Sequence, residues 1–498
     1  MLIINSAAST IGALALAFSA LVQVTHAKDV YIDCSATAAG SGTKKSPYNA
    51  LASVNALNFT AGDEILLKSG TLCNGTLSPQ GNGALSNPVV ISSYGSGALP
   101  IINGQGGQAA IKLLNQGGWH ITKVAVTNPA TTVNARQGIS ITANDNQTHT
   151  GIFVDHVSVY DVAGQTNKAT QSESYIVSAG ILVDGSNFTS RFNDVYVSSN
   201  NIQNCGGGGI KVRMGQMNNQ GQNGHVWNNI IENVGGDGIV MSYVDSPLID
   251  HNECSGLGSG HYPWTGGNFA GIWVLGCHNA VMEYNIVHNT LMSAFDSEAF
   301  DCDWGNTGNC TVQYNYGHDN AGGMFLNCDG CGTSGGANQF VRYNVFQNDC
   351  RMYSNGNIPT LWFYNNVVYC PNQHFNLTVP PKSHFWNNIF VGTADSTLPT
   401  GSGIDWSYNI FETVSLPAGG TNNTAGDPGF VAPGTGGNTT ASVAGYKLKS
   451  GSIALGDGGV VTNNGGLDFW GNSVSATAKP NRGAYNGPAV KTSKHRRH

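Results

Sequence analysis

The triplets Tyr284-Asn285-Ile286, Tyr314-Asn315-Tyr316 and Tyr343-Asn344-Val345 decide how this chain folds, because the same motif recurs along most of its length. Its other copies begin at Asn200, Asn228, His251, Asn365, Asn387 and Tyr408. The second residue of each copy, from Asn201 to Asn409, advances by 28, 23, 33, 30, 29, 22, 22 and 21 residues. A minimum near 21 with longer exceptions is typical of a coil of three short strands, some of whose turns carry loops.

Single coils of this size cannot bury their own apolar side chains, so they stack into one continuous core. Asparagine at the same corner of every coil can adopt the left-handed backbone conformation and hydrogen-bond to the asparagine of the next coil. The repeats therefore predict an asparagine ladder with a structural role. The aromatic residues of the motif, Tyr284, Tyr314 and Tyr343, are predicted to stack along the solenoid.

A second motif follows each asparagine and predicts one strand in each of five successive coils. These strands are Gly209 to Arg213, Gly238 to Ser242, Gly271 to Leu275, Ala299 to Asp303 and Gly323 to Asn327. Because side chains alternate along a strand, Phe300 and Cys302 are predicted to point inward. The predicted outward pairs are Lys211/Arg213, Val240/Ser242, Trp273/Leu275, Asp301/Asp303 and Phe325/Asn327. Neighbouring coils lie about 4.8 Å apart, so one exposed face carries two cations, an indole, two carboxyl groups and an aromatic ring.

The stretch Phe295-Asp296-Ser297-Glu298-Ala299-Phe300-Asp301-Cys302-Asp303-Trp304 stands out on this face, because it holds four acids in a chain that is only 10% charged. Two acids on one exposed strand face repel each other and contribute nothing to folding. Asp301 and Asp303 are therefore predicted to be functional, and Glu298 is predicted to join them from a loop. Loops should overhang the same face. Gly256 to Asn268, with His261 and Trp264, is predicted to form a wall beside Trp273, while Asp296, His318 and Asp319 lie at neighbouring turns.

The stacked asparagine corners and aromatic-lined coils resemble the right-handed parallel β-helix of the pectin-lyase-like superfamily, which includes secreted carbohydrate-active enzymes. The resemblance covers roughly residues 30–415. We accordingly expect an all-β, single-stranded solenoid, a right-handed parallel β-helix with an N-terminal cap. Residues 28–415 would form the catalytic β-helix domain, 416–490 a C-terminal cap and 491–498 a disordered basic tail.

The N-terminus and the cysteines predict secretion. Residues 1–27 read as a signal peptide, with an apolar run from Ile11 to Val24. Eight Asn-x-Ser/Thr sequons follow, so we expect an extracellular glycoprotein. Eleven cysteines imply disulfides with at least one thiol left over. Cys302–Cys310 and Cys328–Cys331 are the predicted short-loop pairs, and half a zinc site is the alternative for the second pair.

The predicted activity is glycoside hydrolysis of a cell-wall or extracellular polysaccharide or oligosaccharide. That reaction uses two carboxyl groups that flank the glycosidic bond. Asp301 would act as nucleophile or base, and Glu298 or Asp303 as general acid. Aromatic rings and acids around them suit a sugar. The predicted substrate-binding residues are Trp273, Phe325, Asn327, His261, Trp264, Asp296, His318, Asp319, Lys211 and Arg213.

Two alternatives remain open at this point. One is a polysaccharide lyase acting on a uronate polymer, with Ca²⁺ held by the acids and Lys211, Arg213 or His261 as base. The other is a non-catalytic carbohydrate-binding β-helix protein. For a hydrolase we expect no cofactor. Net charge of −7 argues against nucleic acid as a partner, no later stretch is apolar enough to span a membrane, and we expect a monomer.

Overall fold

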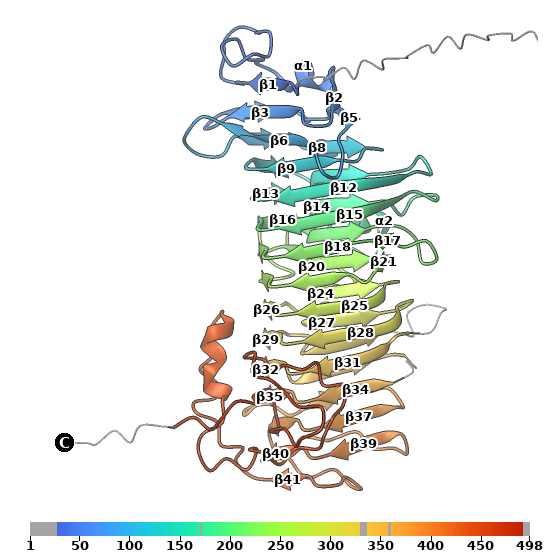
Figure 1. The fold of residues 1–498 in the computed structure, drawn as a ribbon, viewed down its shortest axis with the longest axis vertical. Coiled ribbons are helices and arrows are strands. Elements are labelled where there is room, and N and C mark those ends of the chain that lie inside the picture. Colours follow the sequence, from blue (N-terminus) through green and yellow to red (C-terminus); the bar gives the residue numbers. More distant parts are fainter. Residues whose placement is uncertain (1–26, 170–171, 329–335, 357–359, 492–498) are drawn as a thin grey trace, which may run out of the picture.

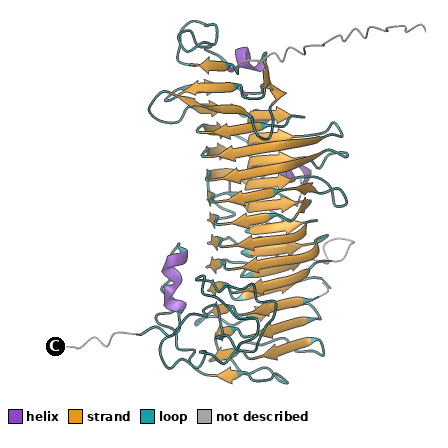
Figure 2. Ribbon diagram, viewed as in Figure 1, coloured by secondary structure: helices purple, strands orange, loops and turns teal. Residues whose placement is uncertain are grey.

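The computed structural model describes residues 27–169, 172–328, 336–356 and 360–491 of the 498-residue chain. Within them the chain forms a tall stack of coils (Figure 1) in which almost all regular structure is strand (Figure 2). All strand pairings between coils are parallel, which confirms the predicted right-handed parallel β-helix. The predicted signal peptide, apart from Ala27, and the predicted basic tail, apart from Lys491, lie outside the described residues.

Each coil contributes strands to three faces, and one face carries the functional residues discussed below. The first face contains β1 (Asp29–Ile32), β3 (Glu64–Lys68), β6 (Val89–Tyr94), β9 (Trp119–Thr122), β12 (Thr148–Asp155), β15 (Arg191–Ser198), β17 (Gly221–Gln222), β18 (Gly224–Trp227), β21 (Val244–Asp245), β22 (Leu248–Asp250), β25 (His278–Glu283), β28 (Thr307–Gln313), β31 (Asn338–Arg342), β34 (Leu361–Tyr364), β37 (Ser383–Trp386) and β39 (Ile404–Ser407). The second contains β4 (Leu72–Asn74), β7 (Ile101–Asn103), β10 (Ala125–Asn128), β13 (Ser158–Val162), β19 (Ile230–Glu232), β23 (Glu253–Ser255), β26 (Ile286–His288), β29 (Tyr316–His318), β32 (Val345–Gln347), β35 (Val367–Tyr369), β38 (Ile389–Val391), β40 (Ile410–Glu412) and β41 (Thr424–Ala425). The third contains β8 (Ala109–Leu114), β11 (Gln137–Thr142), β14 (Ala179–Asp184), β20 (Gly235–Ser242), β24 (Ile272–Leu275), β27 (Phe300–Asp303), β30 (Phe325–Cys328), β33 (Arg351–Ser354) and β36 (Asn376–Leu377), while β16 (Asn201–Arg213) bends from the second face into the third.

The asparagine ladder exists and is fully hydrogen-bonded. At Asn285 the backbone N–H and the side-chain Nδ2 both donate to Oδ1 of Asn315, at 2.9 and 3.1 Å, and Asn315 donates in the same way to Asn344. Two details differ from prediction. The first ladder residue is Asn200 and not Asn201, because Asn201 already belongs to β16 and pairs with Ile230.

The second difference concerns the left-handed backbone conformation, which the residue before each ladder asparagine adopts. Tyr284, Tyr314 and Tyr343 have φ of 54°, 59° and 52°. The turn is made one residue early, and the asparagine that follows can then point its amide into the stack. The stacking predicted for these tyrosines is confirmed for Tyr284 and Tyr314, whose ring centroids lie 5.0 Å apart, and Tyr343 continues the row at a tilt.

The predicted register of the third face is confirmed in four coils and wrong in the fifth. Ile239 pairs with Ile272, and Trp273 pairs with Asp301, as predicted. In β30, however, Phe325 pairs with Phe300 and Leu326 with Asp301. The prediction places the start of this strand one residue early, on Gly323, which instead lies in the preceding turn with φ 92°.

The two ends of the solenoid are covered differently. Near the N-terminus lies the short helix α1 (Leu51–Asn55), whose Leu51 and Val54 are buried. The segment after β41, which includes the 3₁₀-helix Thr440–Tyr446, lies beside the lower coils (Figure 1). Its buried residues pack sideways on six coils of the second face. These are Phe430, Val443, Tyr446, Leu448, Phe469 and Tyr485, packed with Ile286, Tyr316, Val345, Val367, Ile389 and Ile410.

Three disulfides are described, and one of them, Cys302–Cys310, was predicted. The others join Cys34 to Cys73 and Cys350 to Cys370. The predicted Cys328–Cys331 pair lies partly outside the described residues, since Cys331 is not among them. Three thiols, those of Cys205, Cys254 and Cys277, are free and buried. In the described parts of the chain no helix is both long and apolar enough to cross a membrane.

Candidate active site

A cavity of about 630 Å³ opens on the third face, over β20, β24 and β27. Three acids of the predicted cluster, Asp296, Asp301 and Asp303, line it together with Trp273. Two overhanging segments, around Lys168 and from Gly267 to Ala270, form further parts of its walls. The volume lies within the range of small-ligand sites, which is about 300–1,000 Å³. The structure thus brings the strand acids, the loop acid and the predicted indole into one site.

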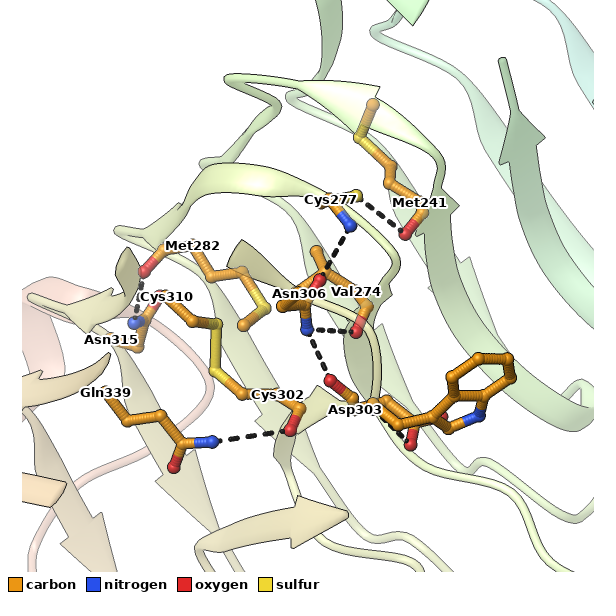
Figure 3. Close-up of a disulfide and its surroundings, with 11 residues drawn as sticks. Met241, Val274, Cys277, Met282, Cys302, Asp303, Asn306, Cys310, Asn315 and Gln339 are labelled. Carbon is orange, nitrogen blue, oxygen red and sulfur yellow. Dashed lines mark hydrogen bonds between the residues drawn. A yellow bond between two sulfur atoms is a disulfide. The ribbon is translucent and has the colours of Figure 1, made fainter. Parts of the chain in front are cut away.

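β27 holds two of the acids because its apolar residues face the core. Phe300 and Cys302 are buried, and the Cys302–Cys310 disulfide ties the strand to β28 (Figure 3). Just after the strand, the side-chain Nδ2 of Asn306 donates to the carbonyl oxygens of Asp303 and Val274, at 2.6 and 3.0 Å. The strand end is therefore fixed from two sides, which leaves the Asp301 and Asp303 side chains on the outer surface facing the cavity.

The two strand carboxyl groups differ in exposure and in hydrogen bonding. Asp301 is only 4% exposed, and its Oδ1 has no hydrogen-bond partner among the described residues. Burial, reinforced by the charge of Asp303, raises the pKa of Asp301 well above its usual range, so this group holds its proton. Asp303 is partly exposed and accepts a hydrogen bond of 2.8 Å from the backbone N–H of Trp304. Burial raises the pKa of Asp303 to about 7, while that N–H and Lys168 act in the opposite direction.

The loop acids, Asp296 and Glu298, point in different directions. Asp296 is partly exposed and lines the cavity; burial raises its pKa, and Lys168 and Arg351 oppose that shift. Glu298 is fully buried and pairs with Arg351 at 2.6 Å, outside the cavity lining. Burial raises the pKa of Glu298 to about 8. Asp296, which was predicted only to bind substrate, therefore contacts the cavity. Glu298, which was predicted to be catalytic, lies behind it.

A hydrogen-bonded network centred on Asp237 forms the wall beside Trp273. Oδ1 of Asp237 accepts from the Trp273 indole at 2.9 Å, and Oδ2 accepts from the Tyr175 hydroxyl at 2.5 Å. Nζ of Lys211 lies 3.4 Å from Oδ2 and 3.8 Å from the centroid of the Tyr175 ring. Burial lowers the pKa of Lys211 to about 8. Lys211 and Arg213, which pairs with Asp184, line a side recess of about 80 Å³ that shares Trp273 and Asp237 with the main cavity.

Two predicted binding residues are wrong for this face because of the register shift at β30. Phe325 pairs with Phe300 and is fully buried in the core, and Asn327 pairs with inward-facing Cys302 and is 1% exposed. Leu326 takes the outward position beside Asp301. The spacing could have revealed this. Nine residues separate Asn200 from Gly209 and Asn229 from Gly238, and nine residues after Asn315 is Met324, not Gly323.

Four other predicted binding residues do not line the cavity. His261 is exposed and lies 3.3 Å from Asp161. Trp264 packs behind the wall, edge-on to Tyr175, so its ring supports the site without contacting the cavity. His318 stacks on His288 on the second face, and Asp319 accepts its hydrogen bond there. The turn with His318 and Asp319 follows β29 of the second face, so it opens to another side of the solenoid than the cavity.

Sequence reasoning missed three residues of the site. Asp237 is not among the predicted site residues, although it is the sole acid in the run Gly235 to Gly238. Tyr175 and Lys168 belong to an overhanging segment between β13 and β14 that includes α2 (Ser172–Ile176). Its length marks it as an insertion, but no periodicity fixes its direction. The described residues contain no group of three or more His, Cys, Asp or Glu side chains arranged to bind a metal ion.

Fold and site together define a parallel β-helix protein with a carboxyl-lined cavity on one face. No protein-family model matches the chain. A lacto-N-biosidase from Bifidobacterium longum subsp. longum is 28% identical over 316 residues, 54% of this chain. The chain covers only 19% of that relative's length.

A solved structure shares the architecture. It is the GH136 lacto-N-biosidase from Eubacterium ramulus, known in a selenomethionine and a native form, and each aligns with a TM-score of 0.52. The alignment covers 80% of this chain and 67% or 68% of the other, at 18% identity. At that identity the likeness establishes the fold.

Proposed function

We propose that this chain is a glycoside hydrolase that acts outside the cell on an oligosaccharide or polysaccharide, as a monomer and without a cofactor. The observation that carries the proposal is the convergence of Asp296, Asp301 and Asp303 with Trp273 on one cavity. The sequence relative and the structural neighbour, both named lacto-N-biosidases, support a glycosidase. The three disulfides support an oxidising, extracellular location.

The chemistry divides between the two partly exposed acids. Asp303 acts as the general acid, because burial raises its pKa to about 7 and so favours its protonated form. Asp296 acts as the ionised carboxylate, nucleophile or base, because the charges of Lys168 and Arg351 both stabilise its anion and it reaches the cavity from the facing loop. Two carboxyl groups in opposite protonation states are what glycosidic cleavage requires. Asp301 remains protonated and uncharged beneath them, so it limits the repulsion around Asp303.

Sugar recognition falls to the aromatic wall. Trp273 is partly exposed, and Asp237 holds its indole N–H, so the ring is fixed at the cavity edge. Aromatic faces stack on the apolar faces of sugar rings. Phe269 and Trp304 also line the cavity, and the side recess beyond Trp273 extends the site towards Lys211 and Arg213.

The test is product analysis with the secreted, purified chain. Aryl glycosides, including an aryl lacto-N-bioside, and wall polysaccharides are incubated with the wild type and with Asp303→Asn. New reducing ends that disappear in the variant support hydrolysis. Ultraviolet absorbance of an unsaturated uronate, lost with a chelator, would establish the lyase instead. Binding without any turnover, unchanged by Asp303→Asn, would establish a carbohydrate-binding protein.

A further inference from the structure

The loop that carries Asp296, residues 289–299 between β26 and β27, is anchored at almost every residue around the acid. The backbone N–H of Phe295 donates to Oδ1 of Asn268 at 3.1 Å. Ser297 is buried, its N–H donates to the Phe269 carbonyl at 2.8 Å, and its carbonyl accepts from the Thr290 hydroxyl at 2.7 Å. Ser297 also has φ 88°, a conformation rare outside glycine. A backbone held this tightly around one cavity-lining acid indicates a positioning device.

Arg351 on β33, two coils further along, adds a further anchor to this loop. Its Nη2 donates to the Phe295 carbonyl at 2.6 Å, and its Nη1 donates to Oε1 of Glu298 at 2.6 Å. The guanidinium thus grips the loop on both sides of Asp296. Its planar fork suits this double contact better than a lysine ammonium could. Arg351 also donates to the carbonyl of Gly322 at 3.1 Å, which ties the fork to the next coil.

Gly322 allows the loop to lie this close. A Cβ added there would stand 2.1 Å from the Ser297 carbonyl carbon and 2.4 Å from the Glu298 nitrogen, both backbone atoms that cannot move aside. Glu298 itself is fully buried, and its Oε2 has no hydrogen-bond partner among the described residues. A buried carboxyl group that leaves one oxygen without a partner is a costly arrangement, so a use beyond stability is indicated.

We propose that Arg351 and Glu298 form a positioning clamp, assisted by Gly322, that fixes the carboxyl group of Asp296 in the cavity. The inference rests on the proposed function, because it assigns the clamp a part in the same hydrolysis. The clamp contacts no cavity-lining atom of Asp296 and acts only through the loop backbone and its charge. A misplacement of a catalytic group by about 1 Å can cost about 10²-fold in rate.

The experiment is a double-mutant cycle between Arg351 and Asp296, measured as kcat and KM on an activated aryl glycoside. Arg351→Met should lower kcat by about 10²-fold with little change in KM, and Arg351→Lys should recover part of the loss. In an Asp296→Asn background, Arg351→Met should cause no further loss, because the residue it positions is gone. Glu298→Gln, which keeps the shape, should give a smaller loss of the same kind.

The pH dependence of kcat provides a second measurement, because general destabilisation of the protein would not shift it. The titratable groups that face Asp296 are the cations Lys168 and Arg351 and the acids Asp237, Asp301, Asp303 and Glu298, of which Asp301 holds its proton. Loss of the Arg351 charge disfavours the ionised form of Asp296, so the limb of the profile set by Asp296 should move to higher pH in Arg351→Met and stay in place in Arg351→Lys.

Arg342→Met is the matched control. Arg342 is also largely buried and donates to the Tyr364 hydroxyl at 3.0 Å and to Gln313 at 2.7 Å, on the first face. It should lower the melting temperature without changing kcat at a temperature where the protein is folded. Full activity of Asp296→Asn would overturn both the proposed catalytic carboxylate and the clamp. An inactive Asp296→Asn with an unimpaired Arg351→Met, or with additive losses in the double variant, would overturn the clamp alone.

Discussion

The asparagine ladder and the carboxyl cavity both bury polar side chains, and they do so in opposite ways. In the ladder the same residue recurs at each rung, and Asn285, Asn315 and Asn344 satisfy one another through Nδ2 and Oδ1. In the cavity region each rung differs, and Asp301 and Glu298 each keep an oxygen without a partner among the described residues. Repetition with complete hydrogen bonding serves stability. Departure from the repeat, at a cost in stability, indicates where the chain does chemistry.

The largest expected effect lies on the cavity side of this comparison. Asp303→Asn removes the proposed general acid and should lower kcat by about 10²–10⁴-fold, with an unchanged or higher melting temperature, because burial disfavours the charge of Asp303. Steady-state kinetics and thermal unfolding test both parts. Asp194→Asn, on the first face, is the control and should leave kcat unaltered. Loss of stability without loss of activity in Asp303→Asn would make the acid structural.

On the ladder side, Asn315→Ala should lower the stability of the protein and leave its activity unchanged. Asn315 is fully buried, and its removal leaves the Asn285 N–H and the Met282 carbonyl without their partners. We expect a loss of about 2–5 kcal/mol in unfolding free energy, measured by denaturant titration, with normal kcat in the cold. Asn201→Ala, next to the ladder and exposed, is the matched control and should change stability by less than about 0.5 kcal/mol. Equal effects of the two variants would contradict the ladder's role.

The burial of Asp301 should make the folded protein less stable as the pH rises. Its folded pKa is raised, so above the unfolded value of about 3.9 unfolding releases a proton. Stability therefore falls with rising pH until the folded group also ionises, by up to about 1.4 kcal/mol per pH unit for one proton. Asp301→Asn should reduce this slope between about pH 4 and pH 7. Unfolding curves at several pH values measure it, and an unchanged slope would mean that Asp301 is ionised in the folded protein.

The smallest expected effect belongs to Lys168, whose charge opposes the rise in the pKa values of Asp296, Asp301 and Asp303. Lys168→Met removes the cation, so each carboxyl group needs a higher pH to ionise. The whole pH–activity profile should move upward by a fraction of a unit, with kcat at the optimum largely kept. Lys382→Met, at an exposed position on another part of the solenoid, should leave the profile in place.

Regularity also explains how much could be predicted from sequence. The coil repeat, the ladder, the tyrosine stack and the pairing of Trp273 with Asp301 all follow from spacing, and all are confirmed. The failures lie where the period breaks. The predicted register is wrong at Gly323, where a turn inserts one residue. The directions of Asp296 and Glu298 depend on a loop whose anchors include Arg351, 53 residues beyond Glu298. The repeat could not predict the positions of Tyr175 and Lys168, because both residues lie in an insertion.

The sideways packing of the C-terminal segment has a consequence for biosynthesis. Solenoid coils contact mainly their neighbours, so they can form in order as the chain leaves the ribosome. The apolar outer surface from Ile286 to Ile410, however, is covered by residues as late as Tyr485. The lower coils therefore expose a hydrophobic stripe until translation is nearly complete. A chain truncated before Phe430 would keep that stripe exposed, even though most of its coils and all of its cavity residues had already been made.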